Sequence, residues 1–154
     1  MHLYFEDLLE ESYHYVSAMP EKADIYLTTD TEKKKAAIEK VFAKLPCNKL
    51  EVRVIKNRGR DVSSLLVGVK DVIMDYDLVC FAHDKKTAQV KPGTIGASFA
   101  YKCFENTLSN KAYVGNVINT FVNNPRMGLL CPPEPNHSTF FTTIGFEWGP
   151  NFNI

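Results

Sequence analysis

Two short polar segments carry the side chains of this chain that could do chemistry. The first is the NRGRD corner, Asn57-Arg58-Gly59-Arg60-Asp61, and the second is the HDKK segment, His83-Asp84-Lys85-Lys86. Guanidinium groups bind phosphate in a bidentate manner, and free backbone amides at the start of a helix favour anions. The NRGRD corner therefore predicts a site for an anion such as a diphosphate.

The NRGRD corner also has a purely structural interpretation. Asp61 would cap the helix that follows, Gly59 would supply a positive φ, and Asn57 would tolerate a left-handed conformation. Arg58 and Arg60 would then be solvated surface charges. Capping explains the aspartate and the glycine but leaves the paired arginines unexplained, so we favour the anion site.

The HDKK segment combines an imidazole, a carboxylate and two ammonium groups. The Asp84 carboxylate could hold a divalent cation on a diphosphate, because Mg²⁺ and Mn²⁺ prefer oxygen ligands. Lys85 and Lys86 could instead neutralise phosphate directly and make a metal unnecessary. The structural alternative is a charged turn after a strand. The chain has no HExxH, GxGxxG or GxxxxGK[ST] motif, so a nucleotidase-type or dinucleotide-type phosphate loop is not supported.

The stretches around these segments predict alternating strands and helices. Runs rich in β-branched and aromatic residues predict strands at 1–5, 24–29, 49–55, 76–83 and 126–130. Apolar residues at helical spacing predict helices at 6–19, 32–45, 61–73, 96–110 and 111–124. The run at 76–83 is almost wholly apolar, which is typical of a central strand covered on both faces.

This alternation predicts an α/β fold with an open, mostly parallel sheet and helices on both faces. Ligands bind to such sheets outside the carboxyl ends of the strands. The predicted strands end near Tyr4, at Thr28-Thr29-Asp30, at the NRGRD corner and at the HDKK segment. All four ends would deliver polar side chains to one edge, which predicts a ligand cleft there. Asp30 or Thr31 could cap the helix that follows, and for Asp30 we favour this capping role over a ligand role.

Length and composition limit the class of protein. The chain has 154 residues, which suits a single domain with its own core. Lys+Arg and Asp+Glu are both 18, so the formal net charge is zero and nothing recommends a nucleic-acid or membrane surface. The acidic start predicts no signal peptide. The four cysteines form no CxxC pair, and with no secretory signal we expect them to be reduced thiols in a cytoplasmic protein.

Five segments, in order, resemble the rhamnan synthesis protein F family: YFEDLLEE, DIYLTT, VIKNRGRDVSSLL, YDLVCFAHDKK and NNPRMGLLCPP. The resemblance runs from about His2 to about Pro133, and the NRGRD corner and the HDKK segment are its most specific parts. Proteins of that family are regarded as glycosyltransferases, typically rhamnosyltransferases, of bacterial cell-wall polysaccharide and lipopolysaccharide assembly. The resemblance implies a GT-A-like fold, with residues 1–154 forming a single domain or the donor-binding part of one.

The resemblance also assigns roles to residues. It places the whole NRGRD corner, Lys85 and Lys86 on the donor side of the cleft, and Thr28 and Thr29 beside the nucleotide base or ribose. His83 and Asp84 are the expected catalytic residues, because they fall where many GT-A enzymes keep a DxD metal motif. The first aspartate of that motif is absent here, so Asp84 alone would bind Mg²⁺ or Mn²⁺ weakly.

The function implied is transfer of a sugar, rhamnose from dTDP-rhamnose, to a bacterial surface polysaccharide. The expected partners are a nucleotide-diphospho-sugar donor, a polysaccharide acceptor and, peripherally, the membrane assembly machinery at the inner face. The alternative is a non-catalytic module that binds nucleotide sugar or glycan or scaffolds polysaccharide assembly, which the missing aspartate and the short chain favour. A third reading is a regulatory domain for another phosphorylated ligand. The base for the acceptor hydroxyl stays open between His137 and Glu147.

Overall fold

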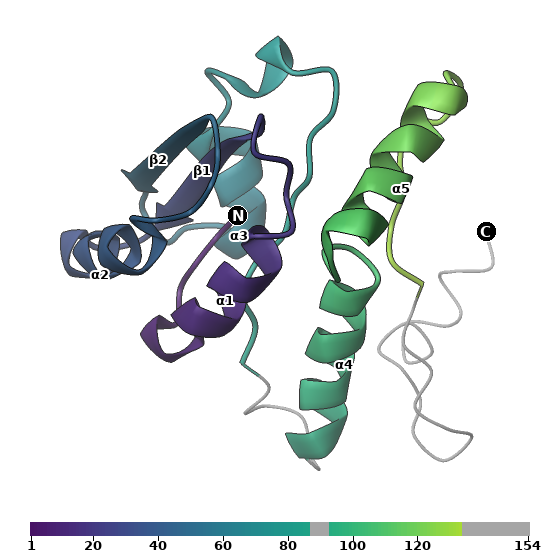
Figure 1. Cartoon of the computed structure of the whole chain (residues 1–154). Helices are drawn as coiled ribbons and strands as arrows, with labels where there is room; N and C mark the ends of the chain where they lie inside the picture. Colours follow the sequence, from purple (N-terminus) through teal and green to yellow (C-terminus); the bar gives the residue numbers. More distant parts are fainter. Residues whose placement is uncertain (87–92, 134–154) are drawn as a thin grey trace. The chain divides into compact units, whose positions relative to one another are not determined.

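The computed structural model describes residues 1–86 and 93–133 (Figure 1). The chain divides into two compact units, Met1–Lys85 and Lys86–Ile154. That residues 1–154 form a single domain, or the donor-binding part of one, stays a prediction.

The first unit is built on a two-stranded parallel sheet. β1 (Asp24–Thr29) and β2 (Lys49–Val54) are paired along their full length, and both were predicted from their β-forming residues. α2 (Glu32–Phe42) connects them and begins where predicted, because the Thr31 hydroxyl accepts a hydrogen bond from the Lys34 amide at 3.3 Å. This strand–helix–strand unit confirms the α/β class.

Two further segments extend this sheet through single bridges rather than full strands. His2 forms parallel bridges with both Thr28 and His83. The Leu3 amide donates to the Thr28 carbonyl at 2.8 Å, and the Asp84 amide donates to the His2 carbonyl at 3.0 Å. The order across the edge is therefore β2, β1, the N-terminal segment (residues 1–4) and residues 82–84. The parallel direction is confirmed, whereas the extended GT-A-like sheet is not.

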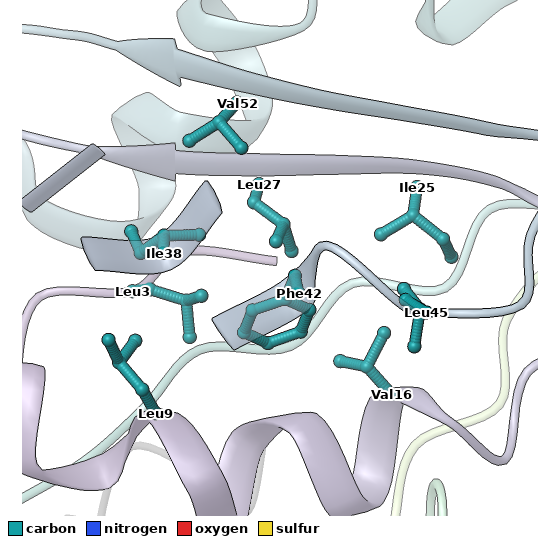
Figure 2. Packing of buried hydrophobic residues seen from close by; sticks show 9 residues of the cluster. All are labelled: Leu3, Leu9, Val16, Ile25, Leu27, Ile38, Phe42, Leu45 and Val52. Atoms are coloured by element: carbon teal, nitrogen blue, oxygen red, sulfur yellow. The ribbon is translucent and has the colours of Figure 1, made fainter. Parts of the chain in front are cut away.

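One face of the sheet is covered by α2 and by α1 (Leu9–Val16), which follows the 3₁₀ turn η1 (Glu6–Leu8) (Figure 1). Figure 2 shows the apolar side chains that fill the space between these helices and the strands. Each large side chain buried in this way contributes about 1.5–3 kcal/mol. The cluster consists of Leu3, Leu9, Val16, Ile25, Leu27, Ile38, Phe42, Leu45 and Val52. It fixes the strands whose carboxyl ends form the candidate site.

The opposite face carries a broken helix where we predicted a continuous one over 61–73. The described elements are α3 (Arg60–Ser63), the π-helical turn η2 (Ser64–Gly68) and the 3₁₀ turn η3 (Ile73–Asp75). Gly68 explains the break. A Cβ at Gly68 would meet the Thr28 methyl carbon at 3.3 Å, so the backbone lies directly on β1. The Gly68 carbonyl accepts a hydrogen bond from the Arg53 guanidinium at 2.9 Å.

The prediction of a central strand over 76–83 is wrong except at its end. Only His83 forms a bridge, and Leu78 and Val79 are 43% and 52% exposed. An apolar run is buried on both faces only if a neighbouring strand pairs along it and a layer covers it. In the described part of the chain, residues 76–81 have no strand paired along them, and the Ala82 carbonyl accepts only the His2 amide of the bridge, at 3.0 Å.

The second unit contains α4 (Gly93–Glu105) and α5 (Lys111–Asn123), which confirms both predicted helices. The Asn110 side chain caps α5 by accepting the Tyr113 amide at 3.0 Å. The strand predicted over 126–130 is wrong, since those residues are described without regular structure. His137 and Glu147 lie outside the described residues. No helix in ranges 1–86 and 93–133 has the length and hydrophobicity needed to cross a bilayer.

Candidate functional site at the carboxyl edge of the sheet

The NRGRD corner and the HDKK segment meet at the carboxyl edge, as predicted. Asp61 Oδ2 lies 3.6 Å from His83 Nδ1, and both side chains are partly exposed. Asp61 is not the helix cap that the structural alternative required, because the N-cap position of α3 belongs to Gly59 and has no side-chain hydrogen bond. The carboxylate is thus available to orient the imidazole.

The backbone of the corner turns sharply through two consecutive left-handed residues. Gly59 has a φ of 82°, as predicted from its residue type, and Arg60 has a φ of 51°. Arg58 and Arg60 are exposed, and within the described residues neither side chain forms an ion pair. α3 has only four residues, which is too short for its first amides to form the helix-start anion site that we predicted. An anion site at this corner stays a prediction, and it would depend on the guanidinium groups.

Three buried polar side chains are hydrogen-bonded in a row next to this edge of the sheet. Thr28 Oγ1 lies 2.9 Å from His2 Nδ1 and 2.5 Å from Ser64 Oγ, and all three residues are buried. Burial lowers the pKa of His2, so the imidazole is neutral at pH 7. These hydrogen bonds connect the N-terminal segment, β1 and η2. The sequence pattern did not single out His2 or Ser64, although Ser64 follows Asp61 at helical i, i+3 spacing.

Asp84 lies at the point where the N-terminal segment leaves the sheet. Its Oδ2 accepts hydrogen bonds from the Tyr4 amide at 2.8 Å and the Phe5 amide at 2.7 Å. Oδ1 has no hydrogen-bond partner among the described residues, and the residue is 5% exposed. Burial raises the pKa of Asp84, and the Phe5 and Tyr4 amides oppose this rise.

Lys34, on α2, brings a cation to the same edge. Its Nζ lies 2.7 Å from Asp30 Oδ1 and 3.6 Å from the centre of the Tyr4 ring. Asp30 therefore pairs with Lys34, while Thr31 is the N-cap of α2. The Lys34 charge also acts on Asp84, where it favours the ionised carboxylate.

The remaining predicted donor residues differ in exposure. Thr28 and Thr29 are 1% and 0% exposed, and Thr29 Oγ1 has no partner in the part of the chain that is described. Their contact with a nucleotide stays a prediction. Lys85 is partly exposed and Lys86 is exposed, directly after Asp84. Their contact with a donor stays a prediction.

The residues of this edge do not fit a divalent cation well. Within residues 1–86 and 93–133, no three His, Cys, Asp or Glu side chains are grouped closely enough to hold a metal ion. Mg²⁺ and related hard cations take about six oxygen ligands. Asp84 would offer one buried oxygen, because the other is bonded to two amides. A role of Asp84 as a ligand of Mg²⁺ or Mn²⁺ stays a prediction.

A parallel α/β unit that gathers charged side chains at its carboxyl edge has the general arrangement in which such proteins bind ligands. The family model described as "Rhamnan synthesis protein F" matches residues 1–154, and the chain belongs to this family. The family description points to rhamnan and polysaccharide synthesis in general. Neither the curated proteins nor the solved structures give a match to this chain.

Proposed function

We propose that the carboxyl edge binds the nucleotide-diphospho-sugar donor of a glycosyltransferase in polysaccharide synthesis. The carrying observation is the 3.6 Å contact between Asp61 and His83, which joins the two cation-bearing segments at one edge. Arg58 and Arg60, within three residues of Asp61 in the sequence, are exposed and could bind a diphosphate through charge-assisted hydrogen bonds. The family supports a polysaccharide product, and rhamnose from dTDP-rhamnose is our proposal for the transferred sugar.

Sugar transfer needs stabilisation of the departing diphosphate and a base for the acceptor hydroxyl. In this proposal the arginines of the corner, together with Lys85 and Lys86, compensate the charge of the diphosphate. His83 is the candidate base, because it is partly exposed and the Asp61 carboxylate could hold its imidazole in one orientation. Asp84, the other expected catalytic residue, is too buried to meet an acceptor directly.

Calorimetric titration of dTDP, UDP and dTDP-rhamnose tests donor binding. The test variant is Arg58→Gln/Arg60→Gln, and the matched control is Lys40→Gln/Lys44→Gln, which removes two exposed cations near the other end of α2. A hydrogen bond to a charged group contributes about 1.5–3 kcal/mol, so we expect the test variant to lose at least about tenfold in affinity. Equal weakening in both variants, or no binding by the parent chain, would refute the proposal.

The second candidate is a non-catalytic module that binds the same donor or a glycan. The burial of Asp84 and the engagement of its Oδ2 by backbone amides favour it, because they leave His83 as the one expected catalytic side chain with access to solvent. Release of dTDP from dTDP-rhamnose in the presence of a rhamnan acceptor distinguishes the two. Release that His83→Asn abolishes, with donor binding retained, supports the enzyme. Binding with no release supports the module.

A further inference from the structure

We propose that Asp84 is a positioning residue whose carboxylate fixes the turn at Tyr4 and Phe5, and that the anion site beside it works without a divalent cation. The second part rests on the proposed function, because the anion is the same diphosphate. The first part concerns the chain alone.

Asp84 joins three residues of the N-terminal segment and the turn after it. Its amide donates to the His2 carbonyl at 3.0 Å, and its Oδ2 accepts the amides of Tyr4 and Phe5 at 2.8 and 2.7 Å. These two amides lie just past the last bridge of the sheet, and no strand among the described residues accepts them. Both hydrogen bonds are partly buried, and a shielded amide without a partner is costly, so one carboxylate oxygen satisfies both amides where the backbone ladder ends.

The surroundings of Asp84 argue against a metal at this position. A cation would have to bind Oδ1, which is enclosed in a residue that is 5% exposed. The Lys34 ammonium, held by Asp30 and the Tyr4 ring, makes only a small contribution at this carboxylate, where it lowers the pKa of Asp84. A divalent ion near this carboxylate would also be repelled by this ammonium.

The charge of a diphosphate has an alternative partner at the same edge. Arg58 and Arg60 are exposed and form no ion pair within the described residues, so their guanidinium groups are not already neutralised. Arginine matches the geometry of phosphate oxygens through two parallel hydrogen bonds. Two such groups could take the role that a metal ion has in other diphosphate sites.

Two substitutions separate the positioning role from a metal-ligand role. Asp84→Asn keeps an oxygen that can accept both amides but removes the charge, whereas Asp84→Ala removes the acceptor. We expect Asp84→Asn to melt within about 3 °C of the parent and Asp84→Ala to melt at least about 5 °C lower. Equal destabilisation by both substitutions would overturn the positioning role, because it would show that the shared acceptor oxygen does not matter.

The metal is tested directly. Electron paramagnetic resonance of Mn²⁺ mixed with the protein should show free ion only, and dTDP should bind equally in EDTA, Mg²⁺ and Mn²⁺, within about threefold. Protein-bound Mn²⁺ that Asp84→Asn releases, or dTDP binding that EDTA abolishes, would overturn the metal-free site and leave the proposed function standing. If dTDP fails to bind in every condition, the metal-free diphosphate site falls with the proposed function. The melting temperatures then still decide the positioning role of Asp84.

Discussion

Thr28→Val would remove one hydroxyl group from the centre of the row of three buried polar side chains and leave the side-chain volume nearly unchanged. Thr28 Oγ1 is the shared partner of His2 Nδ1 at 2.9 Å and Ser64 Oγ at 2.5 Å. His2 and Ser64 are 5% and 3% exposed, so water cannot readily replace the lost partner. The valine would leave both groups without a hydrogen bond.

The cost follows from the two groups left unsatisfied. Each buried polar group without a partner costs about 1–3 kcal/mol, and relief from burying the threonine hydroxyl offsets part of this. We expect Thr28→Val to lower the free energy of unfolding by about 2–4 kcal/mol. Thr29→Val is the matched control, because Thr29 is 0% exposed and its hydroxyl has no partner among the described residues. That substitution should be neutral or stabilising by up to about 1 kcal/mol.

Urea unfolding followed by circular dichroism measures both free energies, and a cycle with Ser64→Ala isolates the pair. Thr28→Val and Ser64→Ala remove the same hydrogen bond, so the double variant should lose at least about 0.5 kcal/mol less than the sum of the single variants. Additive effects, or a Thr29→Val variant as unstable as Thr28→Val, would refute the reasoning.

Three further predictions concern His2 and the corner. Burial holds the pKa of His2 in the folded state below its ordinary value of 6.5. The free energy of unfolding should therefore be at its full value above pH 6.5 and fall as the pH drops below 6.5. Urea unfolding between about pH 5 and 8 measures this slope, which His2→Asn should flatten. Gly59→Ala should cost about 1–2 kcal/mol of unfolding free energy, because φ is 82° and the new Cβ would lie 3.2 Å from the Ser63 Cβ. Arg60→Gly should raise the melting temperature, since φ at Arg60 is 51°, and an unchanged temperature would argue against strain there.

Local patterns were enough to predict the elements that pack on one another. The β-forming runs of β1 and β2 and the apolar spacing in α2 include residues that are buried, such as Leu27, Ile38 and Val52. The chemistry at strand ends was also predictable in part. Parallel strands direct their carboxyl ends to one edge, which is why Asp61 and His83 could be expected to meet.

The sequence pattern failed where long-range contacts decide the backbone. The apolar run at 76–83 reads as a buried strand, yet pairing depends on neighbours far away in the chain, and only His83 has one. The helix over 61–73 breaks because Gly68 packs on β1 and its carbonyl is bonded to Arg53, fifteen residues earlier. Such competition for a helix carbonyl leaves no mark on helical periodicity.

The order of the segments bears on which residues of the edge meet a ligand. Along the chain the order is the N-terminal segment, β1, β2 and residues 82–84. Across the edge the order is β2, β1, the N-terminal segment and residues 82–84. The order therefore reverses between the N-terminal segment and residues 82–84, which is the position where α/β sheets open to a ligand. Here Asp84 fills that position by bonding the Tyr4 and Phe5 amides. If the edge binds a diphosphate, the ligand must lie on the neighbouring side, where Asp61 meets His83 and the arginines of the corner are exposed.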